Sequence, residues 1–289
     1  MSRIALGTAQ FGLAYGVANE KGQLGQIEAN QAVKIAENGG IDTIDTAILY
    51  GNSEASLGRA GVTGFKVVTK LPAIPDGCSN VEAWIYEQVE GSLFRLNTNK
   101  LYGLLLHRPA QLIDAHGDQI YAAMRHLKEI GKVQKIGIST YSINELAVFT
   151  KDFDFDLIQA PFNLIDRRLV TSGWLAKLNS KGIETHVRSV FLQGLLLMDK
   201  KLTPQKFHHW SNIWCQWYEW LEINQVSALQ ACISFALSFK EIDKVVVGID
   251  GTDHLQDILM AANNKKLYEY PNIISESENL INPAMWPNL

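Results

Sequence analysis

Short apolar runs alternate with longer segments of helical periodicity along the whole chain. Each apolar run is rich in branched residues and lacks the polar alternation of a half-exposed antiparallel strand, so each is predicted to form a buried parallel strand. The predicted strands span residues 4–9, 41–47, 65–71, 101–107, 135–140, 157–162, 184–190 and 244–249. The segments between them, among them "IEANQAVKIAEN", "GDQIYAAMRHLKEIGKV" and "RRLVTSGWLAKLNSKG", have the apolar spacing of amphipathic helices.

Eight successive strand–helix units predict a closed parallel sheet. Strands that alternate with helices indicate right-handed parallel crossovers, and eight such units favour a (β/α)8 TIM barrel over an open doubly wound sheet. The chain has 289 residues and is 47% hydrophobic. This length suits one barrel domain of about 250 residues better than two average domains, so residues 1–289 are predicted to form a single domain.

Two segments fall outside the strand–helix repeat. Residues 10–25, "QFGLAYGVANEKGQLG", carry several glycines and are predicted to form an N-terminal hairpin that plugs the bottom of the barrel. Residues 194–223 form an insertion after the seventh strand. Trp210, Trp214, Trp217 and Trp220 recur there at spacings of three and four, which places them on one helical face. That face either packs on the barrel, which is the simpler interpretation, or forms a lid over its mouth.

Composition restricts the class of protein further. The formal net charge is -4 and no long basic tract occurs, so we expect neither a nucleic-acid nor an anionic-membrane partner. No stretch of eighteen apolar residues and no signal-like N-terminus is present. Cys78, Cys215 and Cys232 have no CxxC spacing, which argues against a disulfide framework and a zinc site. A cytoplasmic protein without a metal is expected.

Four ionisable side chains are predicted to meet at one end of the barrel. Asp45 and Tyr50 follow the second strand, Lys70 ends the third, and His107 closes the fourth. In (β/α)8 barrels the chemistry gathers where strands end and the following loops begin. Each residue alone has an ordinary explanation, such as a solvated lysine or a helix cap, but their joint occurrence on three consecutive strands indicates an active site.

These four groups suit proton transfer to a carbonyl. Free tyrosine has a pKa of about 10, and a nearby ammonium, Lys70, is expected to lower the pKa of Tyr50. A buried lysine needs a counter-charge, which Asp45 can supply. His107 can donate a hydrogen bond to a substrate oxygen. Tyr50 is therefore predicted to be a general acid aimed at a carbonyl oxygen.

The motifs that carry these residues resemble those of the aldo-keto reductase superfamily. They are "GTAQFG", "IDTIDTAILYGNSE", "VVTKL", "LLLHRP", "GKVQKIGISTYS" and "LIQAPFNL", in the family's order over residues 1–190, with a weaker echo at 244–264. The resemblance implies a barrel enzyme that reduces aldehydes and ketones with a nicotinamide cofactor and without a metal. It also implies that Asp45, Tyr50, Lys70 and His107 form the catalytic tetrad, with Tyr50 the proton donor.

The resemblance implies a set of cofactor contacts as well. Ser139 and Gln159 match the pair that bonds the nicotinamide carboxamide, and Thr140 replaces the asparagine often found beside that serine. The other implied contacts lie at the ribose, along the pyrophosphate and beside the nicotinamide. They are Gly7, Thr8, Asp45, Arg188, Ser189, Phe191, Gln193, Gly194 and Gly248.

Two departures from the family pattern affect the expected ligands. Arg188 stands where the family commonly has an aromatic residue against the nicotinamide; its guanidinium can stack, and would suit a carboxylate or phosphate on the substrate. The segment "GIDGTDHLQDILMAAN" carries Asp250, Asp253 and Asp257 where basic residues usually grip the 2′-phosphate. Carboxylates disfavour a phosphate but accept ribose hydroxyls, so the cofactor is either NADP or NAD.

Three functions remain open from the sequence. The first is a carbonyl reductase or alcohol dehydrogenase acting on a small-molecule carbonyl. The combination of "GTAQFGLAYGVANEKG" and "RSVFLQGLLL" resembles a branch associated with bacterial surface-sugar biosynthesis, which favours a sugar or nucleotide-sugar carbonyl. The second is a nicotinamide-binding sensor with vestigial activity. The third is an aldolase that forms a Schiff base on Lys70.

Overall fold

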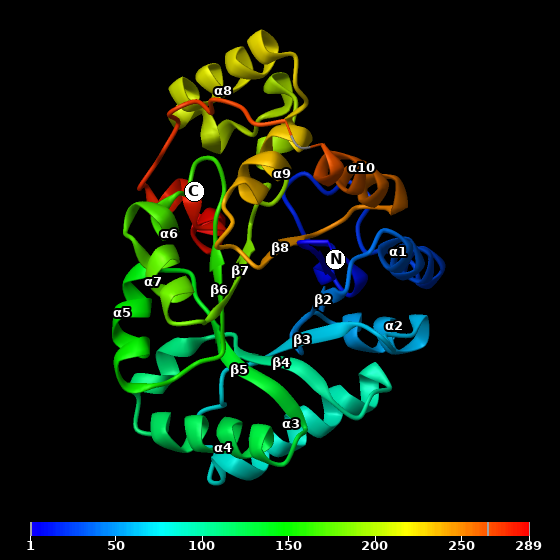
Figure 1. Ribbon diagram of the computed structural model, residues 1–289, viewed down its shortest axis with the longest axis vertical. Helices are drawn as coiled ribbons and strands as arrows, with labels where there is room; N and C mark the ends of the chain where they lie inside the picture. Colours follow the sequence, from blue (N-terminus) through cyan, green and yellow to red (C-terminus); the bar gives the residue numbers. More distant parts are fainter. Residues whose placement is uncertain (1, 265, 289) are drawn as a thin grey trace.

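Eight parallel strands form a closed barrel in which each strand pairs with its neighbours in chain order. The computed structural model describes residues 2–264 and 266–288, and Figure 1 shows helices arranged around the outside of the strands. The strands are β1 (Ile4–Gly7), β2 (Thr43–Asp45), β3 (Lys66–Leu71), β4 (Leu101–Leu106), β5 (Val133–Ser139), β6 (Leu157–Pro161), β7 (Glu184–Arg188) and β8 (Lys244–Val247). The predicted (β/α)8 barrel is confirmed.

Most strands end before the apolar runs that predicted them. β1 ends at Gly7 rather than at residue 9, β7 at Arg188 rather than at 190, and β8 at Val247 rather than at 249. An apolar run reports burial, whereas a strand also needs a neighbour to which it can hydrogen-bond. The residues beyond each strand leave the ladder while they are still largely buried, and they form the loops at the carboxyl end of the barrel.

The helices follow the predicted segments with one exception. They are α1 (Gln26–Asn38), α2 (Ser53–Ala60), α3 (Val81–Leu96), α4 (Gly117–Glu129), α5 (Ile143–Asp152), α6 (Arg168–Thr171), α7 (Trp174–Ser180), α8 (Ser211–Asn224), α9 (Ala228–Ser238), α10 (Thr252–Asn263) and α11 (Glu278–Ile281). Short 3-10 helices are η1 (Ala9–Phe11), η2 (Pro109–Ile113), η3 (Leu195–Leu197), η4 (Lys200–Leu202), η5 (Gln205–Trp210) and η6 (Pro283–Asn288). The segment 167–182 forms two helices, because Gly173 adopts a left-handed conformation with φ +79°.

The predicted hairpin at residues 10–25 is wrong in both form and place. No strand forms there; after η1 the chain runs as a loop whose turn is built around Asn19. The Asn19 side-chain oxygen accepts the N–H groups of Lys21 and Gly22, and its amide donates to the Tyr15 carbonyl. These local bonds replace a strand ladder. Because the loop follows the carboxyl end of β1, it lies at the catalytic end of the barrel and not at the bottom.

The insertion after β7 contains η3, η4, η5 and α8, and the structure supports packing of its tryptophan face. Trp214 and Trp217 are buried, and Trp217 stacks on Trp220 with ring centroids 5.8 Å apart. The indole N–H groups of Trp214, Trp217 and Trp220 donate to the backbone carbonyls of Phe207, Leu196 and Glu269. Figure 1 shows the C-terminal segment running beneath α8. A lid role for these tryptophans is not supported, since none of them lines the main cavity.

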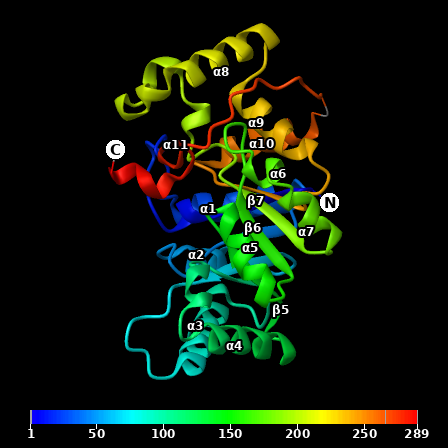
Figure 2. The same cartoon turned by 90° about the vertical axis from the view of Figure 1, so that its left-hand side faces the viewer.

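The C-terminal segment docks onto the same insertion. Trp286 is buried and meets Phe207 of η5 edge to face, with ring centroids 4.8 Å apart. Its indole N–H donates to the Leu280 carbonyl at 3.1 Å. Figure 2 shows α11 on the same side of the molecule as α8, with α3 and α4 at the opposite end. The insertion after β7 and the C-terminal segment, neither of which belongs to the strand–helix repeat, therefore stabilise each other.

A network of charged side chains closes the bottom of the barrel. Asp42 precedes β2 and bonds Lys66 of β3 at 3.1 Å and Lys244 of β8. Glu184 of β7 accepts the Tyr102 hydroxyl of β4 at 2.6 Å and the Lys135 ammonium. Because β4 and β7 are not neighbours in the sheet, the Tyr102–Glu184 bond crosses the barrel interior. These bonds tie together strands that the sheet ladder leaves apart.

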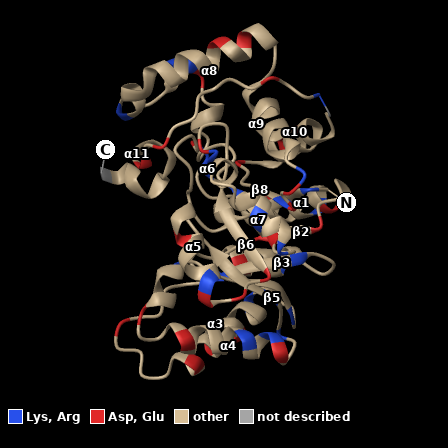
Figure 3. Cartoon of the chain, turned by 60° about the vertical axis from the view of Figure 1, so that its left-hand side comes forward, with Lys and Arg blue, Asp and Glu red and all other residues tan. Residues whose placement is uncertain are grey.

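The outer surface mixes charges of both signs. In Figure 3 blue and red residues are interspersed along α4, which carries Asp118, Arg125, Lys128 and Glu129. Of the helices within residues 2–264 and 266–288, none combines the length and hydrophobicity needed to cross a membrane.

We expect Asp42→Asn to lower the free energy of unfolding by about 2 kcal/mol at pH 7, because it removes bonds to two ammonium groups. Burial alone would raise the pKa of Asp42, but hydrogen bonds from Lys244, Thr43 and Lys66 lower it to about 2. The stabilisation is therefore complete above the ordinary pKa of about 4 and is lost as the pH falls towards 2. Urea unfolding at pH 7, 4 and 2.5 measures this.

The control for Asp42→Asn is Glu90→Gln, which removes an exposed ion pair with Lys132. It should cost less than about 1 kcal/mol. Equal losses in the two variants, or a loss that does not diminish in acid, would contradict the structural role of Asp42.

Candidate active site

A buried ion pair joins β2 and β3 at the carboxyl end of the barrel. The Lys70 ammonium lies 2.6 Å from an Asp45 carboxylate oxygen, and the exposed fractions of the two side chains are 1% and 5%. Lys70 also donates to the Thr46 carbonyl at 2.9 Å. Asp45 thus supplies the counter-charge that a buried lysine requires.

Gln159 holds the second oxygen of the Asp45 carboxylate. Its amide donates to Asp45 at 2.7 Å, and its carbonyl accepts the Ser139 hydroxyl at 3.1 Å. Gln159 lies on β6 and Asp45 on β2, so this bond spans the barrel interior. Sequence reasoning assigned Gln159 to the nicotinamide carboxamide; in the structure it positions Asp45 and does not line the cavity.

Tyr50 and His107 lie beside the ion pair. Tyr50 is in the loop between β2 and α2, with its ring centroid 5.3 Å from the Lys70 nitrogen. Its ring meets that of His107 edge to face at 5.9 Å. The four residues predicted from the strand ends are therefore brought together.

The prediction that Lys70 lowers the pKa of Tyr50 is wrong. Burial, and after it the Asp45 carboxylate, raise the pKa of the Tyr50 hydroxyl above its ordinary value of 10. The Arg188 guanidinium opposes this rise only in part. Burial also lowers the pKa of Lys70, although the Asp45 carboxylate opposes that shift. Burial also lowers the pKa of His107 to about 4, aided by Lys70 and Arg188. Both groups are therefore neutral near pH 7, Tyr50 as a phenol that still carries its proton.

A cavity of about 430 Å³ opens at this end of the barrel, and Tyr50 and His107 line it. Ten of the predicted cofactor-binding residues also line it: Gly7, Thr8, Asp45, Ser139, Arg188, Ser189, Phe191, Gln193, Gly194 and Gly248. Thr140 does not, because its hydroxyl donates to the Ser142 carbonyl at 2.7 Å and to Glu145 instead. Lys70 does not line it either, and its side chain is 1% exposed, which disfavours a Schiff base on that amine.

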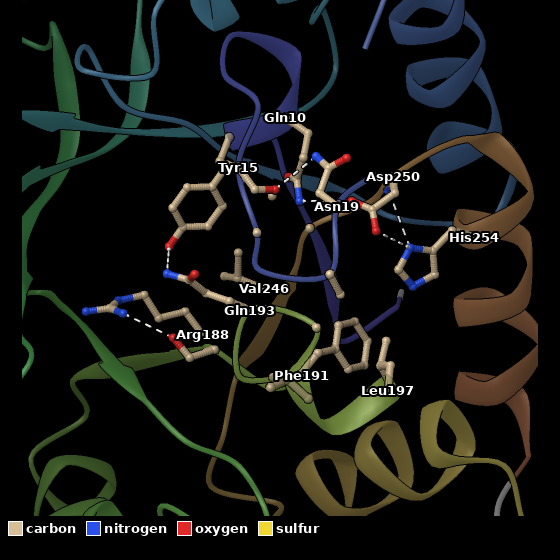
Figure 4. Close-up of a pocket in the computed structure, with 18 of the residues that line it drawn as sticks. Gln10, Tyr15, Asn19, Arg188, Phe191, Gln193, Leu197, Val246, Asp250 and His254 are labelled. Carbon is tan, nitrogen blue, oxygen red and sulfur yellow. Dashed lines mark hydrogen bonds and ion pairs between the residues drawn. The ribbon is translucent and has the colours of Figure 1, made fainter. Parts of the chain in front are cut away.

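The loop after β1 forms part of the cavity wall, which the sequence did not indicate. The Gln193 amide donates to the Tyr15 hydroxyl at 2.9 Å (Figure 4), and the Val17 N–H donates to the Gln193 carbonyl at 3.1 Å. Gly194 is required at this junction: its φ is +89°, and a Cβ there would lie 2.6 Å from the Ala18 Cβ. The loops after β1 and β7 therefore support each other across the cavity.

The loop after β7 contains three non-glycine residues in the left-handed region. The φ angles are +61° at Ser189, +49° at Leu192 and +53° at Gln193. Each such residue costs about 1–2 kcal/mol relative to ordinary backbone. The Asn163 amide donates to the Ser189 carbonyl at 3.0 Å and helps to hold the conformation. Strain of this kind persists where the backbone must be placed for a ligand.

The end of the cavity away from Arg188 has polar groups that suit a nucleoside. Figure 4 shows Asp250 and His254 on the side opposite Arg188, with Gln10 donating to Asp250 at 3.4 Å. The Gln10 amide oxygen and the His254 Nε2 are buried and have no hydrogen-bond partner within the described residues. The Gln10 oxygen can accept a hydrogen bond from a ribose hydroxyl or an adenine amine. Because the His254 Nδ1 accepts the Asp250 N–H at 3.4 Å, its Nε2 carries the proton and can donate to a ribose oxygen. The residues present therefore fit a dinucleotide, and His254 and Tyr141, both lining residues, were missed because no spacing pattern marks them.

Comparisons with known proteins bear on the chain's family and on its fold. The family model described as "Aldo/keto reductase family" matches residues 3–274. "Aldo-keto reductase YhdN" of Bacillus subtilis (strain 168) is 32% identical over 183 residues, 59% of this chain and 53% of that protein. "6-dehydroglucose reductase" of Agrobacterium fabrum is 32% identical over 151 residues, 46% of each chain. These matches span about half the length of the two relatives.

The fold also matches a solved structure described as "aldo-keto reductase AKR11C1 from Bacillus halodurans (holo form)". The TM-score is 0.75 and the sequence identity 20%, over 95% of this chain and 94% of the other. At this identity the likeness concerns the fold alone.

We expect Asp45→Asn to lower the free energy of unfolding by about 3–5 kcal/mol, because it leaves the Lys70 ammonium buried without a counter-charge. Urea unfolding followed by circular dichroism measures the loss. Glu129→Gln, which removes an ion pair in which both side chains are 59% exposed, is the control and should cost less than about 1 kcal/mol. An Asp45→Asn variant as stable as this control would show that the pair does not support the fold.

Proposed function

Since this chain belongs to the aldo/keto reductase family, we propose that it uses a nicotinamide cofactor to reduce an aldehyde or ketone to an alcohol, with Tyr50 as the proton donor. The observation that supports this most directly is the meeting of Tyr50 and His107 at the cavity, directly beside the buried Lys70–Asp45 pair. Family membership implies the reaction class; the roles of these residues are our proposal.

The reduced cofactor supplies the hydride that the carbonyl carbon accepts. In the proposed reaction, neutral His107 donates a hydrogen bond to the carbonyl oxygen and orients it. Tyr50 then gives its proton to that oxygen as negative charge develops there. A phenol with a raised pKa keeps its proton in the presence of water and releases it only to a strongly basic oxygen, such as an alkoxide. The pKa shift of Tyr50 therefore suits an acid that acts during the reduction.

We propose a sugar or nucleotide-sugar carbonyl as the substrate class. The motif combination at residues 7–22 and 188–197 supports this, and so does the relative named for 6-dehydroglucose. The wall formed by Tyr15 and Gln193 presents a hydroxyl and an amide group that can bond sugar hydroxyls.

We propose NAD rather than NADP as the preferred cofactor. Asp250 lines the cavity beside His254, in the segment where the family usually has basic residues. A carboxylate repels a 2′-phosphate and can accept a hydrogen bond from a 2′-hydroxyl. Asp253, three residues later, does not line the cavity.

Tyr50→Phe is expected to lower kcat for carbonyl reduction by about 10²–10⁴-fold, because no other group donates the proton. Titration by NADH fluorescence should give an unchanged Kd, since the ring remains. Tyr121→Phe, which removes a hydroxyl bonded to Asp154 on the outer surface, is the control and should keep full activity. If a broad panel of carbonyls is not turned over by the native protein although NADH binds, the sensor function is favoured instead.

Asp250→Ser is expected to raise the affinity for NADPH relative to NADH about tenfold, because about 1.4 kcal/mol of charge repulsion is removed. Fluorescence titration with both cofactors measures the ratio. The matched variant Asp253→Ser should leave it unchanged. A ratio that is the same in both variants and in the native protein would show that Asp250 does not select the cofactor.

A further inference from the structure

Arg188 is held rigidly at the catalytic end of the cavity. Its guanidinium donates to the Thr140 carbonyl at 2.9 Å and to the Ser189 hydroxyl at 3.2 Å. The guanidinium carbon lies 4.1 Å from the centre of the Tyr141 ring, which suits a cation–π contact. A guanidinium has five N–H donors, so these two bonds leave about three without a partner in the protein.

The charge of Arg188 is not neutralised by the protein. Within the described residues no carboxylate lies within 4.0 Å of it, whereas the Lys70 ammonium is paired with Asp45. Arg188 is also the one lysine or arginine among the residues described as lining the cavity. The lining acids other than Asp45 are Glu20, Asp199 and Asp250, and Asp250 lies across the cavity from Arg188 (Figure 4). Arg188 is thus the cationic side chain that the described cavity offers to a ligand.

The charge is close enough to act on the reacting groups. Arg188 is among the causes that lower the pKa of His107, and it partly offsets the rise in the pKa of Tyr50. A free, half-buried guanidinium with an ordered plane is suited to bind a carboxylate or phosphate through two parallel hydrogen bonds.

We propose that Arg188 binds an anionic group of the substrate, a carboxylate or a phosphate, while the carbonyl of the same molecule lies at Tyr50 and His107. The preferred substrates are then anionic carbonyl compounds, such as oxo acids or phosphorylated sugars, rather than neutral ones. This inference rests on the proposed function. The competing role of Arg188 is a contact with the cofactor, whose nicotinamide the resemblance places against this position, and a test must separate the two.

Binding can be measured without turnover in a Tyr50→Phe background saturated with NADH. Calorimetric titration compares 4-oxobutanoate with its methyl ester, and glyceraldehyde 3-phosphate with glyceraldehyde. The two pairs distinguish a carboxylate from a phosphate. We expect at least one anionic probe to bind more tightly than its neutral partner, and Arg188→Gln to remove about ten- to a hundredfold of that affinity. With NADH kept saturating for each variant, the neutral partner should bind as before, and Arg188→Lys should retain part of the preference.

Three results would overturn the inference. The first is that the native protein binds both members of each pair equally well. The second is that Arg188→Gln loses as much affinity for the neutral member as for the anionic one. The third is that Arg188→Gln mainly weakens the binding of NADH. Circular dichroism and urea unfolding show whether Arg188→Gln has folded. If it has not, the ratio of the affinities of Arg188→Lys for the anionic and neutral probes decides. Turnover of the neutral aldehyde by the native protein tests the proposed function separately. If both members of a pair are reduced equally well, the proposed function stands and the role of Arg188 in substrate binding is contradicted.

Discussion

The catalytic end of this barrel depends on burying one ammonium group. Taking a lysine out of water costs several kcal/mol unless a counter-charge and further hydrogen bonds accompany it. Asp45 provides the charge, the Thr46 carbonyl provides a second acceptor, and Gln159 occupies the remaining carboxylate oxygen from across the barrel. Each of these polar groups is the hydrogen-bond partner of another member of the set. These polar groups therefore hold strands β2, β3 and β6 in one arrangement. Removal of any one of them leaves its buried partner without a hydrogen bond or a counter-charge.

The environment of the buried Lys70–Asp45 pair also affects the protonation state of Tyr50 beside it. Burial and the Asp45 carboxylate raise the pKa of Tyr50, so the phenol keeps its proton. The positive charge available to a ligand comes from Arg188, which has hydrogen bonds and a ring contact but no acidic partner among the described residues. Lys70 and Asp45 connect strands β2 and β3, and Arg188 is the cationic side chain that lines the described cavity.

The two ends of the barrel use buried charge differently. At the bottom, Asp42 and Glu184 each bond two cationic or hydroxyl groups from other strands. At the carboxyl end, buried atoms of Gln10, His107 and His254 lack partners within the described residues. Unsatisfied buried polar atoms cost free energy. Such atoms also occur away from the cavity, on Tyr86, His186 and Tyr270. Those of Gln10, His107 and His254 belong to residues that line the cavity, where a ligand can supply the missing bonds.

The strand–helix alternation alone predicted the barrel, because branched apolar runs separated by amphipathic helices have few other ways to be buried. Asp45, Lys70 and His107 were predicted for the same reason, since a strand's carboxyl end determines where its last side chain lies. Spacing did not predict the loops. Residues 12–24 fold by local bonds to Asn19 and by contact with a β7 loop almost 180 residues later. Nor did it predict that Gln159 reaches Asp45 across the interior or that Arg188 remains unpaired. These depend on distances between segments far apart in the chain, and only the closed barrel sets those distances.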